Sequence, residues 1–160
     1  MLYYLENAEL TECMTCGHSR YKPRTGMGKT LVAYKKLRYF PITLRLQRLF
    51  MLPRTGEHMT WYQSHDAVDG VMVHHYDGKT WKHFNNVHPY FSVESRNVCL
   101  GLCTDGFNLF GSFAAFYSCW PVILTVYNLL SGMCLRSEFM FLYTVIPGLS
   151  SPGWNIDVCL

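Results

Sequence analysis

Two cysteines near the start of the chain have the spacing of a metal-binding turn. Cys13 and Cys16 are separated by two residues, and Gly17 follows directly. Two thiolates at this spacing can bind one tetrahedral zinc ion, and the glycine permits the tight turn that presents them. Zinc needs four ligands, and the sequence contains no second pair of this kind. With His18 as a candidate third ligand at an unusual spacing, the pair is either half of a zinc ribbon or two ordinary thiols on a hairpin.

Asp105 is the most informative carboxylate of the chain. It ends an apolar segment, residues 98–104, and is followed by Gly106 and Phe107. An acidic residue that ends a buried strand is either a turn former or a metal ligand held on a rigid element. The local sequence by itself favours the turn.

Other catalytic motifs are excluded. Residues 26–30 imitate a phosphate-binding loop, but Pro23 stands where that motif requires a glycine, so we predict no ATP site. The histidines do not form a HExxH motif, and no serine lies in a GxSxG elbow. We expect the histidines to lie at the surface or to pack against helices.

Basic residues are concentrated in residues 17–54, which carry ten lysines and arginines and no acidic residue. The rest of the chain carries four basic and eleven acidic residues, so the net charge of +3 hides a strong asymmetry. Such a block favours a polyanionic partner, unless it is a solvated face. The candidates for binding the phosphates of such a partner are Arg20, Lys22, Lys35, Lys36, Arg38, Arg45 and Arg48.

Length and composition predict an ordered chain. The 160 residues are 49% hydrophobic and 16% charged, against about 25% charged in soluble domains, which excludes disorder for most of the chain. No secretory signal opens the sequence, so we expect a reducing compartment and free thiols. The uncharged stretch between Asp105 and Arg136 is long enough to span a membrane, but glycine, proline and asparagine interrupt it, which favours buried strands.

The pattern of apolar residues predicts a mixed α+β fold. We expect strands at residues 2–5, 31–40, 98–104, 121–127 and 139–146, and helices at residues 44–51, 57–64 and 79–86. Thr43 is the expected cap of the first helix, which presents Leu46, Leu49 and Phe50 on one face.

Seven short runs occur in a fixed order along the chain. They are residues 37–41 (LRYFP), 45–50 (RLQRLF), 105–108 (DGFN), 119–122 (CWPV), 127–129 (YNL), 146–148 (IPG) and 156–158 (IDV). Together they resemble the transposases of plant CACTA (En/Spm) DNA transposons, and the resemblance covers essentially the whole chain.

The resemblance implies a DDE-type enzyme with an RNase H-like catalytic core that cuts and joins transposon-end DNA with two divalent ions, Mg²⁺ or Mn²⁺. By position, Asp105 would be the first catalytic carboxylate and a metal ligand, at the end of the first of three strands in an antiparallel meander. Asp157 is a weaker candidate at the start of a helix. Cys13 and Cys16 would be the second half of a four-cysteine Zn²⁺ site whose first half precedes Met1.

The resemblance also implies three parts. Residues 1–40 would form a partial zinc-ribbon hairpin and a basic strand, residues 41–96 a helical connection, and residues 97–160 the first three strands of an incomplete RNase H-like core. We expect a fragment that is inactive alone, because one carboxylate does not hold two ions. The expected partner is DNA, with no membrane and no small-molecule substrate, and the expected location is nuclear.

Two alternatives remain open for the function. The chain could act as a non-specific DNA-binding module through residues 17–54. It could also be a non-functional reading frame of a degenerate transposon.

Overall fold

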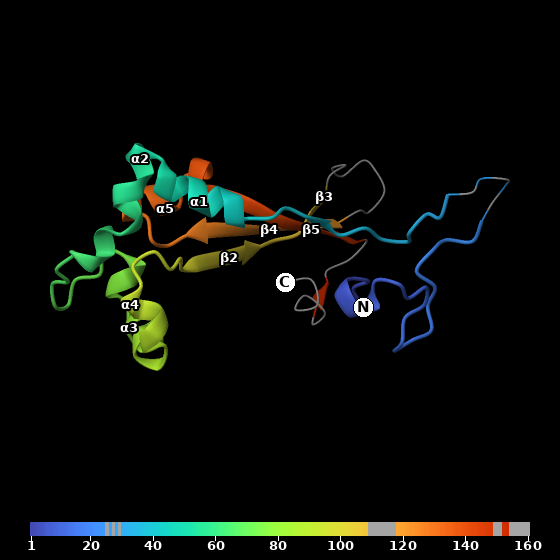
Figure 1. The fold of residues 1–160 in the computed structure, drawn as a ribbon, viewed down its shortest axis with the longest axis horizontal. Helices are drawn as coiled ribbons and strands as arrows, with labels where there is room; N and C mark the ends of the chain where they lie inside the picture. Colours follow the sequence, from blue (N-terminus) through green and yellow to red (C-terminus); the bar gives the residue numbers. More distant parts are fainter. Residues whose placement is uncertain (25, 27, 29, 109–117, 149–151, 154–160) are drawn as a thin grey trace. The chain divides into compact units, whose positions relative to one another are not determined.

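The computed structural model describes residues 1–24, 26, 28, 30–108, 118–148 and 152–153 (Figure 1). Its α-helices there are α1 (Thr43–Met51), α2 (Pro53–Gly56), α3 (Lys79–Val87), α4 (Pro89–Val93) and α5 (Ser131–Cys134). Its strands are β1 (Arg38–Tyr39), β2 (Leu100–Thr104), β3 (Phe107–Asn108), β4 (Ser118–Val126) and β5 (Met140–Gly148). Short 3-10 helices form at Leu5–Asn7, Glu57–Met59, Trp61–Gln63, His75–Asp77 and Ser137–Phe139.

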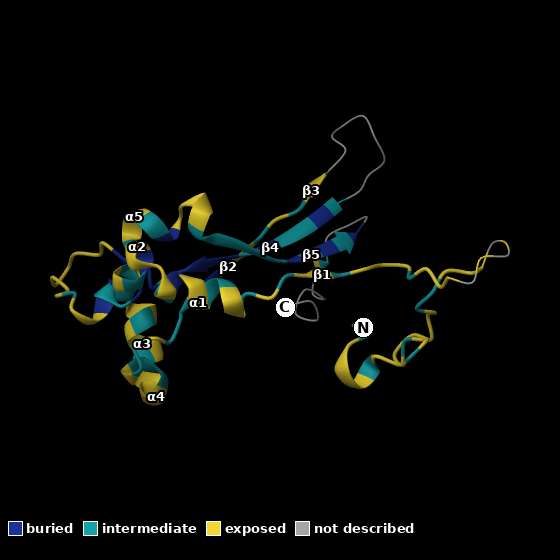
Figure 2. Cartoon of the chain, turned by 45° about the horizontal axis from the view of Figure 1, so that its top comes forward, coloured by how far each residue is buried: buried dark blue, intermediate teal, exposed yellow. Residues whose placement is uncertain are grey.

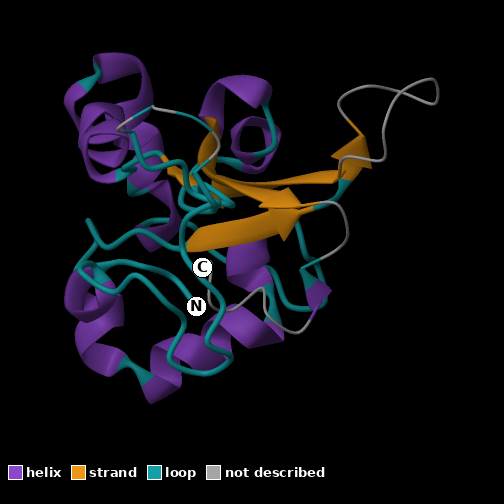
Figure 3. Cartoon of the chain, turned by 90° about the vertical axis from the view of Figure 1, so that its right-hand side faces the viewer, coloured by secondary structure: helices purple, strands orange, loops and turns teal. Residues whose placement is uncertain are grey.

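The strands form one antiparallel sheet with the order β1-β5-β4-β2, and β3 also pairs with β4 (Figure 3). The predicted α+β class and the antiparallel meander of the three long strands are therefore confirmed. Strand β4 has a partner on each side, and its Val, Ile, Leu and Thr side chains are buried or half-buried (Figure 2). A continuous apolar run is typical of a strand that is covered on both faces.

The contacts divide the chain into two compact units. One comprises residues 1–39, 105–121 and 144–160, and the other comprises residues 40–104 and 122–143. In the second unit, helix α1 buries Leu49, with Leu46 and Phe50 packed beside it, as its apolar spacing predicts. The buried cluster around Leu49 is completed by Met59, Val126, Leu129 and Cys134.

One buried amide joins the helical segments of the second unit to the end of β4. The side chain of Asn128 is fully buried, and its Oδ1 accepts a hydrogen bond from the Cys99 amide at 2.7 Å. Its Nδ2 donates to the carbonyl oxygens of Asn97 at 2.9 Å and Met59 at 3.4 Å. The Asn128 carbonyl accepts a further bond from the Trp61 indole at 2.7 Å. Three segments that are distant in sequence thus share one residue.

The histidines do not all lie at the surface. His74 is 4% exposed, accepts a hydrogen bond from the Tyr76 amide at Nδ1 and lies 3.0 Å from the Leu129 carbonyl oxygen at Nε2, which places the ring proton on Nε2. Burial lowers the pKa of His74, so the ring is held neutral. Burial raises the pKa of Asp77, but hydrogen bonds from the Val73 and His74 amides and the nearby His65 outweigh it and lower the pKa overall. We conclude that this cluster is structural.

Several predicted elements are wrong. Residues 2–5 form no strand, because Leu5 begins a 3-10 turn with a φ of 48°. Residues 57–64 form two 3-10 turns instead of one helix, since Thr60 has a φ of −120° between them. Only Arg38 and Tyr39 of the expected strand at 31–40 pair with β5, and Ile42 rather than Thr43 is the N-cap of α1. Helices α2 and α4, each with proline in its first turn, were not expected.

The apolar stretch after Asp105 agrees with the expectation of buried strands over the residues that form β4. Within the described residues, no helix has the length and apolar character that crossing a membrane requires.

We predict that Asn128→Ala destabilises the protein by about 3 kcal/mol, because it leaves the partly buried Cys99 amide and Asn97 carbonyl without this partner and removes a fully buried side chain. Urea unfolding measures the difference. The exposed Asn86 in α3 is the matched control, and Asn86→Ala should change the free energy of unfolding by less than about 0.5 kcal/mol. Equal losses in the two variants would show that the amide network does not hold the unit together.

Candidate functional site

Asp105 lies in a gap between two stretches of the same β ladder. Strand β2 ends with Thr104 opposite Val122, and β3 resumes with Phe107 opposite Cys119. Both stretches keep one register, so the chain does not reverse at Asp105. The turn that the local sequence favours is therefore wrong.

The gap has a cause in the partner strand. The common register places Asp105 opposite Pro121, which has no amide hydrogen and cannot donate to the ladder. The next residue, Gly106, lies under the Trp120 ring, and a Cβ at that glycine would come within 2.5 Å of the indole. Proline and tryptophan on β4 thus fix an unpaired aspartate between two paired segments.

The Asp105 side chain is exposed, and its Oδ1 accepts a hydrogen bond from the Gly106 amide at 2.7 Å. A carboxylate is the kind of ligand that Mg²⁺ and Mn²⁺ prefer. However, the described part of the chain contains no group of three His, Cys, Asp or Glu residues that could hold an ion. Asp105 is therefore the right type of ligand for such an ion, but the described residues supply too few ligands to hold one. No metal-assisted step follows from this arrangement. Asp157 lies outside the described residues.

Cys13 and Cys16 lie on a tight turn that is closed at both ends. The Cys13 amide donates to the His18 carbonyl at 2.9 Å, and the Gly17 amide donates to the Cys13 carbonyl at 2.8 Å. Gly17 has a φ of 65°, which a glycine adopts without strain. His18 does not complete a metal site among the described residues, since its Nδ1 lies 2.8 Å from the Ser19 carbonyl oxygen and its ring packs on Tyr34.

The turn activates one thiol. Hydrogen bonds from the Thr15 and Cys16 amides and from the Cys16 side chain lower the pKa of Cys13 to about 7. Thiolate is the form that binds metals and reacts with electrophiles. The pair therefore has the chemistry of two zinc ligands, with two further ligands needed for a tetrahedral site.

The seven candidate phosphate-binding residues differ in what they contact. The Arg20 guanidinium lies over the rings of Tyr3 and Tyr21 and donates to the carbonyl oxygens of Ala8 and Leu10. In the second unit, Arg45 donates to the Leu142 carbonyl at 3.1 Å. The other five are exposed: Lys22, Lys35, Lys36, Arg38 and Arg48.

Residues 69–160 match the model of the transposase family tnp2, which is more than half of the chain. The chain belongs to this transposase family. Neither the curated proteins nor the solved structures contain a match to it.

The tnp2 match covers part of the site. It includes β2 to β5 and Asp105, and membership of a transposase family implies DNA as the partner in general terms. Cys13, Cys16 and the basic segment 17–54 precede the matched residues. The expected transposase is confirmed, whereas the zinc ligands and the DNA-binding residues stay predictions.

We predict that alkylation of Cys13 by iodoacetamide reaches half its maximal rate near pH 7, because the lowered pKa makes the thiolate available there. Peptide mass spectrometry resolves the sites. Cys16→Ala removes one donor and should raise the midpoint. Cys99 is an internal reference, since burial raises its pKa and it should titrate above Cys13. A Cys13 midpoint that matches Cys99 would contradict the activated turn.

Proposed function

We propose that this chain is part of a DDE-type transposase of the plant CACTA (En/Spm) kind, with Asp105 as one of its catalytic carboxylates. The observation that carries the proposal is the position of Asp105, exposed and unpaired beside the central strand β4 and inside the residues that match the transposase family. Its neighbours in sequence on both sides, Thr104 and Phe107, pair with β4, and a metal ligand is best carried by such regular elements.

The order of the three long strands supports an RNase H-like core as the wider context. Strands β2, β4 and β5 are neighbours in sequence order within the sheet, and Asp105 follows the first of them. In enzymes of this class, two divalent ions activate the attacking oxygen and stabilise the leaving one. The described residues bring no group of three metal-ligating side chains together. We therefore infer that the further carboxylates come from another polypeptide and that the chain does not cut DNA alone.

Exposed cations support DNA binding as a separable activity. Lys22, Lys35, Lys36 and Arg38 belong to one unit and Arg48 to the other, and all five are exposed. Lysine and arginine bind phosphates through counterion release, without regard to sequence. A non-specific DNA-binding module is thus the second candidate function. The Cys13–Cys16 turn would supply two of the four ligands of a Zn²⁺ site near these residues in sequence.

We predict that Mn²⁺ broadens the NMR signal of the Gly106 amide, which lies 2.7 Å from the Asp105 carboxylate. Asp105→Asn should abolish the broadening, and the exposed Asp66→Asn should leave it unchanged. A Gly106 signal that is insensitive to Mn²⁺, or equally sensitive in Asp105→Asn, would show that Asp105 does not bind the ion in this chain. In a parallel assay, we expect no Mg²⁺-dependent nicking of plasmid DNA. Nicking that Asp105→Asn abolishes would overturn the inferred inactivity.

We predict that duplex DNA affinity falls linearly on a double-logarithmic plot against salt, as fluorescence anisotropy of a labelled duplex can measure. Replacing both Lys35 and Lys36 by glutamine should reduce the slope by about 1–2, since each phosphate contact contributes about 0.9. Lys79→Gln, in α3 and outside the basic segment, is the control and should leave the slope unchanged. An affinity that does not respond to salt rules out phosphate binding.

A further inference from the structure

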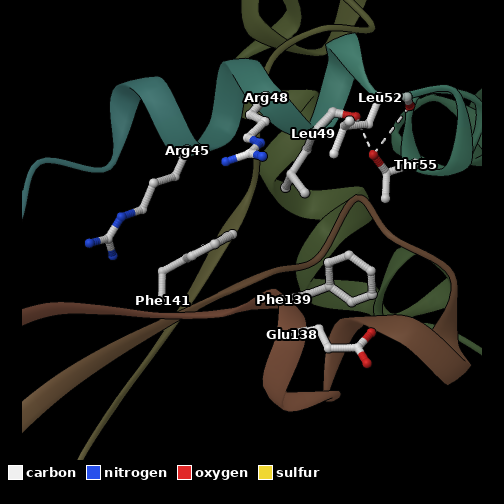
Figure 4. A pocket seen from close by; sticks show the side chains of 8 residues that line it. All are labelled: Arg45, Arg48, Leu49, Leu52, Thr55, Glu138, Phe139 and Phe141. Atoms are coloured by element: carbon white, nitrogen blue, oxygen red, sulfur yellow. Dashed lines mark hydrogen bonds between the residues drawn. The ribbon is translucent and has the colours of Figure 1, made fainter.

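A pocket of about 320 Å³ opens between helix α1 and the start of strand β5, entirely within the second unit. Figure 4 shows the side chains that line it. They are Arg45, Arg48, Leu49, Leu52, Thr55, Glu138, Phe139 and Phe141. The volume lies at the lower end of the range of about 300–1,000 Å³ for ligand sites, which suits one ring system with a charged group.

The inner surface of the pocket is apolar and partly aromatic. Leu49 is buried, and Phe139 and Phe141 pack against the same core cluster while remaining partly exposed. The Thr55 hydroxyl donates to the Leu49 carbonyl at 2.5 Å, so it offers no free donor to the pocket. An occupant therefore meets aromatic and aliphatic side chains there rather than polar groups.

The rim carries two charged side chains that have no ion-pair partner among the described residues. Arg48 and Glu138 are exposed on opposite walls, and the described residues provide neither of them with a hydrogen bond or an ion pair. Arg45 differs, because its guanidinium is bound to the Leu142 carbonyl. In Figure 4 the side chains of Arg48 and Phe141 approach each other from the two walls. The Arg48 cation thus lies beside the Phe141 ring, and the Glu138 carboxylate lies elsewhere on the same rim.

We propose that this pocket binds a single unpaired nucleotide of the DNA, a proposal that rests on the DNA-binding function proposed above. Arg48 binds the phosphate, Phe139 and Phe141 provide the surface on which the base stacks, and Glu138 accepts a hydrogen bond from an exocyclic amino group. Each contact uses an established preference of the residue type. The basic segment 17–54, to which Arg48 belongs, carries no acidic residue, which favours a nucleotide over an acidic peptide.

The geometry predicts a preference among bases. Cytosine presents an amino group at N4, whereas thymine has a carbonyl oxygen at the equivalent position. A carboxylate accepts a hydrogen bond from the cytosine amino group and is repelled by the thymine carbonyl oxygen. Glu138 should therefore favour unpaired cytosine over unpaired thymine.

The test compares three labelled duplexes of the same sequence, one fully paired, one with an unpaired dC and one with an unpaired dT. Fluorescence anisotropy at fixed salt should show the dC duplex bound about tenfold more tightly than the paired one, as stacking of one base implies. Phe139→Leu should remove this preference while retaining affinity for the paired duplex. Glu138→Gln, at an exposed position, should reduce the difference between dC and dT.

Arg54→Gln is the matched control, since Arg54 is exposed in the same basic segment but does not line the pocket. It should weaken all three duplexes by the same factor. Salt-dependent binding with no preference for an unpaired base overturns the pocket proposal and leaves the proposed DNA binding intact. A preference for an unpaired base that persists in both Phe139→Leu and Glu138→Gln also overturns the pocket proposal. No binding to any duplex at low salt removes the DNA-binding function itself. Capture of an acidic aromatic peptide, lost in Phe139→Leu and without a base preference, would assign the pocket to a protein partner.

Discussion

A single buried amide connects three segments of the second unit. Strand β4 ends at Val126, and two residues later the Asn128 side chain bonds to the backbone of Asn97 and Cys99, just before strand β2. It binds one amide and two carbonyl groups, and its own carbonyl accepts from Trp61. Each of these groups would be costly to bury without a partner. Residues 59–61, which precede α3, and residues 97–99, which follow α4, are thereby attached to the end of β4.

A second constraint, Pro121, determines the character of the candidate site. An antiparallel strand would normally pair along its whole length, and Asp105 would then be one more member of a ladder. Because proline cannot donate, the ladder is interrupted opposite it and resumes in the same register. The result is an exposed aspartate that directly follows a paired strand. In an unbroken strand the backbone of Asp105 would be paired, whereas here it is left out of the ladder between Thr104 and Phe107.

The sequence predicts the elements whose signal is local. Helix α1 and strand β4 are recognised from the spacing of their own apolar residues. Helix α3 is recognised from its aromatic residues, Trp81 and Phe84. The segment 57–64 fails because tertiary bonds decide it, since Trp61 and Tyr62 donate to the carbonyl oxygens of Asn128 and Ser95. The position of Asp105 could not be found in the same way, because aligning 98–104 end to end against 121–127 places Thr104 opposite Pro121, and the actual register is shifted by one residue. The pocket could not, because Arg48 and Phe139 are 91 positions apart and share no local pattern.

The arginines show why a count of charges overstates a nucleic-acid surface. Arg20 and Arg45 belong to the basic segment, yet their guanidinium groups are bound to backbone carbonyls that need a donor. Removing either would disturb the fold before it changed any contact with DNA. Arg48 is one helical turn from Arg45 and on the same helix, but its head group has no such bond in the described part of the chain. The difference lies in which carbonyl each side chain can reach. Position on the fold, rather than residue type, therefore separates the cations that support the structure from those that can bind a phosphate.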